Sequence, residues 1–399
     1  MSERYGRSVA QPFRAALPPR PIIAATTFQM TPLTPLTPLT PLTIDEFEAI
    51  ARERMERSAY DYYAGGSGEE RTLAANREAF NRIPLRPRVL IDVSQIDTRT
   101  TVLGQPIDLP VMLAPTAFNR LAHSDGEMAA ARAARAAGTI MISSTLSTCA
   151  LEDVAGACDG PLWFQLYVYK DRGFTQELVA RAEAANYRAL VLTVDTPLLG
   201  RRYRDVRNNF VLPEGITMKN FEAAMTSAAR WGAHSSFSAY VHDLFDATLS
   251  WTAVEWLRTQ TRLPIVVKGI MTEEDARLAV AAGVDGVIVS NHGGRQLDGA
   301  LASIDALPEV ADAVAGRADV LMDGGIRRGT DVLKALALGA RAVCIGRPYL
   351  WALAANGEQG VRDALRVLQD ELSLAMALSG RPAVSSIDRT LVQRRAPAG

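Results

Sequence analysis

The sequence predicts an α/β protein built as a single (β/α)8 barrel. Between residues 109 and 345, eight short runs rich in Val, Ile and Leu follow one another, and amphipathic stretches rich in Ala, Glu and Arg separate them. The apolar runs predict strands buried on both faces, and the stretches between them predict crossover helices. Eight such units favour a closed barrel, because an open doubly wound sheet commonly has only about five or six strands.

The expected strands are short, and helices are expected between them, for example at Glu273–Ala282 and Thr330–Leu338. The strands are expected at Leu109–Ala114, Thr139–Ser143, Leu162–Leu166, Ala189–Val194, Pro264–Val267, Gly286–Val289, Val320–Met322 and Ala342–Ile345. The fourth connection, residues 195–263, is far longer than its neighbours. A long excursion in such a barrel usually covers the active site.

A helical segment is expected ahead of the barrel. Thr43 or Asp45 can cap a helix whose apolar face contains Phe47 and Ile50, and a second helical stretch is expected over Arg71–Phe80. These helices begin the barrel domain, which we expect to span residues 44–399.

Residues 1–43 have a different composition from the rest of the chain. They contain eight prolines, one acidic residue and four consecutive Thr-Pro-Leu triplets. Proline at every third position removes backbone donors and favours extended polyproline II structure. We therefore expect a disordered or semi-rigid extension that carries no part of the function.

Composition excludes several classes of protein. The 43 basic and 44 acidic residues give a net charge of −1, which argues against a nucleic-acid partner. No apolar run approaches the roughly 20 residues that cross a bilayer, so no membrane association is expected. The three cysteines show no CxxC spacing or metal-ligand pattern, which predicts reduced thiols in a cytoplasmic protein and no metal site.

Polar or ionisable residues end nearly every expected strand. In a (β/α)8 barrel the carboxyl ends of the strands meet on one rim, where the active site lies. A barrel built only for stability needs no such cluster, so the pattern indicates an enzyme. The residues at the ends of the expected strands, including the small ones among the polar side chains, are Pro115, Thr116, Ala117, Ser144, Gln165, Tyr167, Thr193, Asp195, Lys268, Ser290, His292, Arg295, Asp323, Gly324, Gly325, Gly346 and Arg347.

The last two expected loops predict a phosphate site. Asp323-Gly-Gly-Ile-Arg-Arg follows the seventh strand and Gly346-Arg347 follows the eighth. Glycines let backbone amides approach an anion closely, and loops seven and eight are the usual phosphate site of these barrels. We therefore expect a ligand that carries a phosphate group.

His292 and Asp195 are candidates for acid–base chemistry. An imidazole can accept a proton near neutral pH, and a carboxylate can orient it and stabilise its charged form. The alternatives are a structural histidine and a helix-capping aspartate beside Pro197. Lys268 has three candidate roles: it could form a Schiff base, bind phosphate or supply a fixed positive charge.

Two arginines are candidates for binding a carboxylate. Arg202 follows the fourth strand beside Arg201, and Arg295 lies three residues after His292. Guanidinium groups grip carboxylates in bidentate fashion. The alternative for the Arg-Arg pair is a solvated surface.

The chain resembles the FMN-dependent 2-hydroxy acid oxidase family over about residues 43–390, and the pattern is most similar to the glycolate oxidases. The most specific match is Ser290-Asn-His-Gly-Gly-Arg-Gln-Leu-Asp. The other matching motifs are Tyr60-Asp-Tyr-Tyr-Ala-Gly-Gly, Phe164-Gln-Leu-Tyr-Val-Tyr-Lys-Asp, Leu192-Thr-Val-Asp-Thr-Pro and Asp323-Gly-Gly-Ile-Arg-Arg-Gly-Thr-Asp.

The resemblance implies a role for each site residue. His292 would be the base with Asp195 as its partner, and Lys268 would stabilise the anionic reduced flavin. The substrate would be bound by Tyr62, Tyr167, Arg202, Arg295 and Leu146. The FMN would be bound by Pro115, Thr116, Ala117, Ser144, Gln165, Thr193, Lys268, Ser290, Asp323, Gly324, Gly325, Arg327, Gly346 and Arg347.

Two positions refine the expected activity. Ala117 stands where oxidases of the family tend to have alanine and several dehydrogenases have glycine, which favours O2 as acceptor and H2O2 as product. Leu146 stands where glycolate oxidases have tryptophan. The smaller side chain predicts a wider pocket, and hence longer or aromatic (S)-2-hydroxy acids such as lactate, mandelate or 2-hydroxy-fatty acids rather than glycolate alone.

Three alternatives have distinct signatures. An inosine-monophosphate dehydrogenase needs a loop cysteine, and none lies between Cys158 and Cys344. A non-catalytic flavin-binding scaffold would lack His292, Arg295 or Tyr167. A dehydrogenase that passes electrons to a quinone or cytochrome stays open. By analogy with the family, we also expect a homotetramer.

Overall fold

A computed structural model describes residues 41–221 and 244–393 of the 399-residue chain. The expected N-terminal extension lies almost entirely outside these residues and stays a prediction. Helix α1 (Ile44–Arg54) begins where the sequence predicts, because the Glu46 amide donates a hydrogen bond to the Thr43 hydroxyl at 3.3 Å.

Eight parallel strands close into a barrel in the order β10-β3-β4-β5-β6-β7-β8-β9. Every strand predicted from the sequence is present, with boundaries that differ by a few residues. The barrel closes where β10 pairs with β3, with Cys344 opposite Met112. The strands are β3 (Val111–Leu113), β4 (Met141–Ser143), β5 (Leu162–Leu166), β6 (Leu190–Thr193), β7 (Ile265–Ile270), β8 (Gly286–Val289), β9 (Asp319–Asp323) and β10 (Ala342–Ile345).

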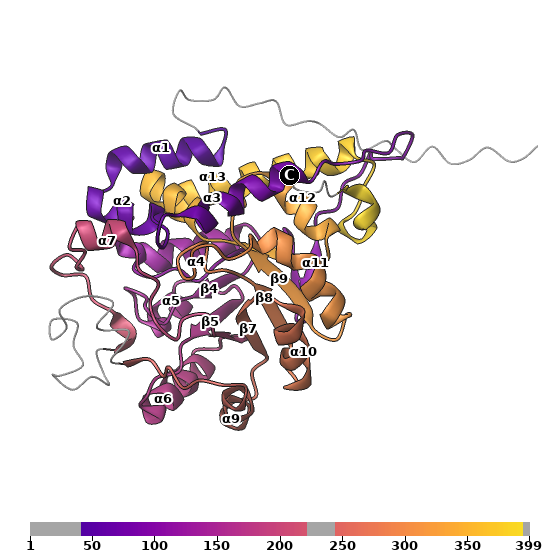
Figure 1. Cartoon of the computed structure of the whole chain (residues 1–399). Helices are drawn as coiled ribbons and strands as arrows, with labels where there is room; N and C mark the ends of the chain where they lie inside the picture. The colour runs from indigo at the N-terminus through magenta and orange to yellow at the C-terminus, as the bar shows by residue number, and fades with distance from the viewer. Residues whose placement is uncertain (1–40, 222–243, 394–399) are drawn as a thin grey trace, which may run out of the picture. The chain divides into compact units, whose positions relative to one another are not determined.

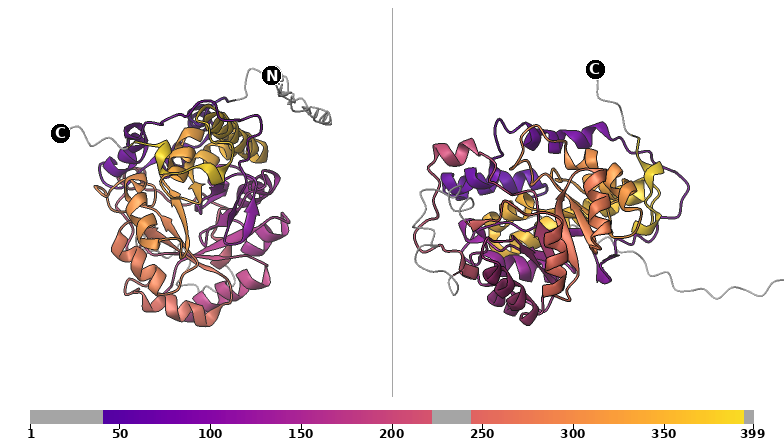
Figure 2. Two further views of the ribbon diagram at one scale, coloured as in Figure 1. Left: turned by 90° about the vertical axis from the view of Figure 1, so that its right-hand side faces the viewer. Right: turned by 60° about the horizontal axis from the view of Figure 1, so that its bottom comes forward.

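Helices cover the outside of the strand ring (Figures 1 and 2). In α13 the backbone is non-helical at Asn356 and Gly357, so it consists of two helices joined at a kink. None of the described helices is long and apolar enough to cross a membrane. The covering helices are α4 (Gly126–Ala136), α5 (Leu151–Gly156), α6 (Arg172–Ala184), α9 (Thr252–Gln260), α10 (Glu273–Ala281), α11 (Ser303–Val314), α12 (Gly329–Ala337) and α13 (Arg347–Leu378).

Alternate residues of the strands face two separate apolar cores. One set, which includes Val191 and Val266, fills the barrel together with Val102 and Ile107 of the hairpin β1 (Thr100–Val102) and β2 (Gln105–Ile107). The other set packs against the helices. The sequence analysis did not predict this hairpin. It lies against the interior cluster, where the Trp163 indole donates to the Gln105 side chain at 3.2 Å.

Three helices precede the barrel: α1, α2 (Arg57–Ala64) and α3 (Arg71–Glu78). Helix α1 packs against α13 (Figure 1). Helix α3 packs against the loop after β9, where Gly325 has φ +83° and an added Cβ would lie 1.9 Å from the Asn76 carbonyl oxygen. Only glycine fits this approach. The helical segment thereby borders the rim of the barrel.

The fourth connection contains α7 (Tyr203–Arg207), a 3-10 turn at Lys219–Phe221 and α9. Its residues 222–243 lie outside the described part of the chain. The connection begins where the pairing of β6 with β7 ends, at Thr193 opposite Lys268. Just beyond, Gly269 has φ +116°, and an added Cβ would lie 2.7 Å from the Asp195 Cβ. This close approach brings Asp195 over the end of β7.

Candidate active site

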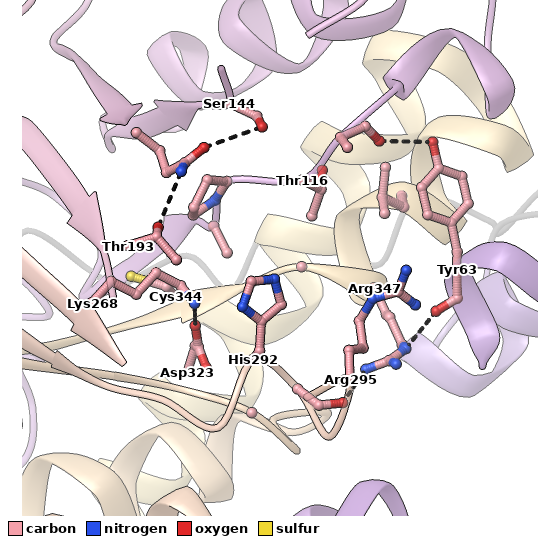
Figure 3. Close-up of a pocket in the computed structure, with 18 of the residues that line it drawn as sticks. Tyr63, Thr116, Ser144, Thr193, Lys268, His292, Arg295, Asp323, Cys344 and Arg347 are labelled. Carbon is pink, nitrogen blue, oxygen red and sulfur yellow. Dashed lines mark hydrogen bonds and ion pairs between the residues drawn. The ribbon is translucent and has the colours of Figure 1, made fainter. Parts of the chain in front are cut away.

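A cavity opens at the carboxyl ends of the strands, and residues from all eight strand ends line it. Its empty space is about 1100 Å³, including the mouth that opens to solvent. The cavity therefore lies on the rim where the sequence predicted function. Figure 3 shows the Lys268–Asp323 pair on one side of His292 and Arg295 and Arg347 on the other.

The structure brings the predicted site residues together. Asp195 and Ser290 do not line the cavity and stand behind residues that do. The Ser290 hydroxyl accepts hydrogen bonds from the Lys268 ammonium at 2.8 Å and from the His292 amide at 3.0 Å. The predicted residues that line the cavity are Tyr62, Pro115, Thr116, Ala117, Ser144, Leu146, Gln165, Tyr167, Thr193, Arg202, Lys268, His292, Arg295, Asp323, Gly324, Gly325, Arg327, Gly346 and Arg347.

His292 is held by Asp195. Its Nδ1 lies 2.8 Å from the Asp195 Oδ1, which also accepts a hydrogen bond from the Thr196 hydroxyl at 3.0 Å. His292 has φ +60°, a conformation that non-glycine residues adopt rarely and that is found at functional sites. The contact at Nδ1 orients the ring so that Nε2 is the nitrogen left for a ligand in the cavity.

The surroundings keep His292 neutral. Burial lowers its pKa below the ordinary value of 6.5, and the nearby positive charges of Lys268 and Arg202 lower it further, while Asp195 raises it. For Asp195, burial opposes ionisation, but His292 and Lys268 outweigh burial and lower its pKa. The pair therefore stands as a neutral imidazole beside a carboxylate, which is the state of a base ready to accept a proton.

Lys268 is a buried ammonium paired with a buried carboxylate. Its Nζ lies 3.1 Å from the Asp323 Oδ2. Burial disfavours the charged form, but the carboxylates of Asp323 and Asp195 outweigh this and raise its pKa. A lysine with a raised pKa is a poor Schiff-base nucleophile, so the geometry favours the fixed positive charge among the three roles that the sequence left open.

Two guanidinium groups flank the ring of Tyr62, at 4.9 Å for Arg295 and 6.0 Å for Arg202. Arg295 is anchored by hydrogen bonds to the carbonyls of Tyr62 and Gly65 at 2.6 and 2.9 Å. Arg202 is buried, and burial together with Arg295 lowers its pKa to about 10. Its Nε and Nη1 have no hydrogen-bond partner within the described residues. The solvated-surface alternative holds for Arg201, which is exposed, and is wrong for Arg202. Arg202 and Arg295 fit a bound carboxylate.

Two more arginines, Arg327 and Arg347, add positive charge to the cavity, and Arg347 shares the Gly65 carbonyl with Arg295. Arg347 donates hydrogen bonds to the carbonyls of Tyr63, Gly65 and Gly293, at 2.7 to 2.9 Å. Burial and the neighbouring arginines lower its pKa well below the ordinary value. The buried Nε of Arg327 lacks a hydrogen-bond partner in the described part of the chain. Within residues 41–221 and 244–393 neither arginine forms an ion pair with a carboxylate, and beside the Gly324–Gly325 loop the two fit a phosphate group.

A row of buried polar side chains forms another part of the cavity wall. The Gln165 amide donates to the Thr193 hydroxyl at 3.1 Å, and the Ser144 hydroxyl donates to the Gln165 carbonyl oxygen at 3.3 Å (Figure 3). Donors and acceptors that alternate along one wall suit a planar heterocycle with several ring nitrogens and carbonyls. The residues present therefore fit a flavin mononucleotide with its phosphate beside Arg327 and Arg347.

Several residues of the cavity wall are not predicted by the sequence patterns. Thr196, which contacts Asp195, lies within the quoted motif Leu192-Thr-Val-Asp-Thr-Pro, and its position shortly after a strand end was the available signal. Phe245 lies far along the fourth connection, where no pattern marks it. The other missed wall residues are Tyr63, Ala114, Leu199, Gly293, Ile326, Cys344, Ile345, Pro348 and Leu350.

The fold and the site together define a phosphate-binding barrel enzyme with a histidine base and a carboxylate-binding pair of arginines. The model of the FMN-dependent dehydrogenase family matches residues 51–394, and the chain belongs to this family. Its cofactor is FMN, and it is an enzyme that oxidises 2-hydroxy acids.

Relatives support this assignment over most of the chain. Glycolate oxidase 1 of Zea mays is 56% identical over 344 residues, which cover 86% of this chain and 93% of the relative. A peroxisomal (S)-2-hydroxyacid oxidase of Arabidopsis thaliana is 51% identical, and the match covers 88% of this chain and 96% of the relative. A crystal structure of mandelate oxidase has a TM-score of 0.83 at 44% identity, and the match covers 90% of this chain and 100% of the solved chain.

The Lys268–Asp323 pair yields a prediction about stability. Lys268→Met leaves a buried carboxylate without its partner and should lower the free energy of unfolding by about 3–5 kcal/mol. The double variant Lys268→Met/Asp323→Asn removes both charges and should recover much of this loss. Urea unfolding of the two variants and the wild type measures both effects. Equal stability of Lys268→Met and the wild type would contradict the pairing.

Proposed function

We propose that this enzyme oxidises an (S)-2-hydroxy acid to the corresponding 2-oxo acid, with O2 as the electron acceptor and H2O2 as the second product. The observation that carries the proposal is the 2.8 Å contact between His292 and Asp195 beside two guanidinium groups. A 2-hydroxy acid needs one site for its carboxylate and a base for its hydroxyl proton, and both lie in one cavity.

Each side chain has a proposed role toward the substrate. Arg202 and Arg295 bind the carboxylate, helped by Tyr62. Tyr167 donates a hydrogen bond to the substrate oxygen, and burial raises the pKa of its phenol, so the hydroxyl keeps its proton. His292 takes the hydroxyl proton at Nε2, and Asp195 stabilises the imidazolium that results.

The cofactor residues have proposed roles toward FMN. Pro115, Thr116, Ala117, Ser144, Gln165 and Thr193 contact the ring system, and Asp323, Gly324, Gly325, Arg327, Gly346 and Arg347 hold the ribityl chain and phosphate. Ser290 acts indirectly, because its hydroxyl positions Lys268. Bound FMN supplies the acceptor for two electrons, and Lys268 supplies the positive charge that stabilises the reduced ring.

A second candidate differs in the electron acceptor. Among solved structures, one with a TM-score of 0.83 and 38% identity is an active chimera of (S)-mandelate dehydrogenase carrying a glycine-to-alanine mutation. A dehydrogenase would pass its electrons to a quinone or another acceptor. Ala117 favours the oxidase, so we propose O2. An oxidase should form one peroxide for each substrate molecule consumed, whereas a dehydrogenase that uses a quinone or another acceptor should not.

Three further properties are proposals. The cysteines Cys149, Cys158 and Cys344 are all unpaired, which agrees with a cytoplasmic enzyme, although one relative is named as peroxisomal. A homotetramer is proposed from the family resemblance. We also propose that residues 1–43 form a separate extension and that the barrel domain spans residues 44–399.

The reaction itself can be tested directly. Purified enzyme with FMN should turn over (S)-2-hydroxy acids and form peroxide, and His292→Ala should lower kcat by about 10²- to 10⁴-fold because the general base is lost. A panel of (S)- and (R)-acids from glycolate to mandelate, assayed for peroxide, measures this. The absorbance spectrum of bound flavin is the control for an intact variant. Near-normal turnover by His292→Ala would refute the assigned base.

Substrate size depends on Leu146, which is buried in the cavity wall. Leu146→Trp should fill space beside the substrate and lose roughly tenfold or more in kcat/KM for mandelate relative to glycolate. Leu146→Met, which conserves volume, is the matched control and should change this ratio little. If the wild type shows its highest kcat/KM with glycolate, the proposed preference for larger acids is wrong.

A further inference from the structure

The side chain of Gln296 lies behind the candidate active site and does not line its cavity. Its amide nevertheless places both N–H groups and its carbonyl oxygen on one neighbouring segment. The Nε2 group donates to the carbonyl oxygens of Asp195 and Leu198, at 2.7 and 2.9 Å. The Oε1 atom accepts a hydrogen bond from the Gly200 amide at 3.0 Å. One side chain thus holds three main-chain groups of the segment that follows β6.

Residues 195–200 depend on Gln296 for their main-chain hydrogen bonds. Within residues 41–221 and 244–393, the three bonds to Gln296 are the only hydrogen bonds that main-chain atoms of this segment form. The segment contains no helix or strand. A loop without internal hydrogen bonds keeps a fixed conformation only through its contacts with other parts of the protein. Gln296 is therefore the main polar support of this segment.

The segment also packs directly against the backbone that carries Gln296. An added Cβ on Gly200 would lie 2.4 Å from the Arg295 carbonyl oxygen and 2.7 Å from the Gln296 Cα. Only glycine lets the two backbones approach this closely. The turn before α3 supports both sides, because the Ser67 and Gly68 amides each donate one main-chain hydrogen bond at 2.9 Å, one to each side. The interface between the two segments is therefore tight, and Gln296 supplies its side-chain hydrogen bonds.

The two segments that Gln296 joins carry both halves of the proposed substrate site. The first begins with Asp195 and ends with Arg202, and the second runs from His292 to Arg295. Each segment supplies one member of the acid–base pair and one guanidinium group. The 2.8 Å contact between Asp195 and His292 crosses from one segment to the other. Its geometry depends on the relative position of the two segments.

We propose that Gln296 is a positioning residue, which sets the distance between His292 and its carboxylate partner and places Arg202 relative to Arg295 from outside the cavity. The inference rests on the proposed function, because it assigns a role within that site. Catalytic groups must be held close to their productive geometry, and a misplacement of about 1 Å can cost about 10²-fold in rate. Without the Gln296 amide, only packing and the contacts from the turn before α3 hold the first segment.

Gln296→Met tests the proposal, because methionine has a similar length and removes all three hydrogen bonds without adding charge. Gly200→Ala is an independent variant, which keeps the amide and pushes the two backbones apart. Gln105→Met is the matched control. Gln105 is also partly buried, and it accepts a hydrogen bond from the Trp163 indole near the start of β5, away from the active-site rim. Every variant is assayed with FMN bound and (S)-lactate as substrate, and urea unfolding measures its stability.

Gln296→Met should lower kcat by about tenfold or more, because Asp195 no longer holds the base in place. The charged groups around His292 have opposite effects: Asp195 raises its pKa, whereas Lys268 and Arg202 lower it, as burial does. A looser contact with Asp195 should therefore move the acid limb of the pH profile of kcat/KM to lower pH. A glutamine that served stability alone would leave this limb in place.

The other variants separate positioning from a general loss of structure. Gly200→Ala should shift the acid limb in the same direction as Gln296→Met. Gln105→Met should lower the stability and keep both kcat and the limb. In the Asp195→Asn background, Gln296→Met should lower kcat by only about threefold or less, because the contact that it positions is already broken.

Two results would overturn the inference while the proposed function stands. One is a folded, FMN-loaded Gln296→Met enzyme with the kcat and the acid limb of the wild type. The other is an equal loss of kcat from Gln296→Met in the wild type and in the Asp195→Asn background. If Gln296→Met does not fold, the same two comparisons are made with Gly200→Ala. A wild type that turns over no 2-hydroxy acid would contradict the proposed function, and the role of Gln296 would fall with it.

Discussion

The candidate site depends on four ionisable side chains that end four neighbouring strands. Asp195 and His292 follow β6 and β8, Asp323 ends β9, and Lys268 lies near the end of β7; these four strands are adjacent in the barrel. The two contacts, at 2.8 Å between Asp195 and His292 and at 3.1 Å between Lys268 and Asp323, link them pairwise. These four residues are far apart in the sequence, and the fixed order of parallel strands in the barrel brings them to these contact distances.

This order also sets the protonation states. Lys268 lies near the carboxylates of Asp195 and Asp323, which stabilise its positive charge. That charge in turn disfavours a positive charge on His292. An isolated histidine next to an aspartate would have a raised pKa; here burial and the neighbouring cations outweigh the aspartate. The imidazole is thus neutral because of its whole surroundings, and the base does not depend on a single partner.

The remaining charge in the cavity is positive. Arg202, Arg327 and Arg347 all have a lowered pKa, in each case first because of burial. Buried guanidinium groups are costly unless an anion faces them. Among the described carboxylates Arg202 has only Asp205 nearby, with its Nη1 3.8 Å from the Asp205 Oδ2. Under the proposed function the arginines of the cavity face two anionic groups, the substrate carboxylate and the FMN phosphate. Binding of both ligands therefore relieves a cost that the fold carries.

The sequence predicted the barrel well, because each strand is a continuous apolar run with a polar residue at its carboxyl end. The same rule located Lys268, His292 and Asp323. It could not locate Phe245, because the position of this residue depends on how the fourth connection packs over the ends of the strands. The hairpin β1–β2 and helix α2 were missed because they are short, with three residues in each strand and eight in the helix. Arg202 was ambiguous in sequence, since burial of one arginine of an adjacent pair is decided only by tertiary packing.

The pH dependence of kcat/KM in the wild type and in Asp195→Asn tests the central claim most directly. In the wild type the rate should rise with pH through an apparent pKa below 6.5, because only the neutral His292 accepts a proton. Asp195 raises that pKa, so its removal should move this limb to still lower pH while kcat falls. A limb that moves to higher pH, or stays in place, would contradict the assignment of His292 and Asp195 as the base and its stabilising partner.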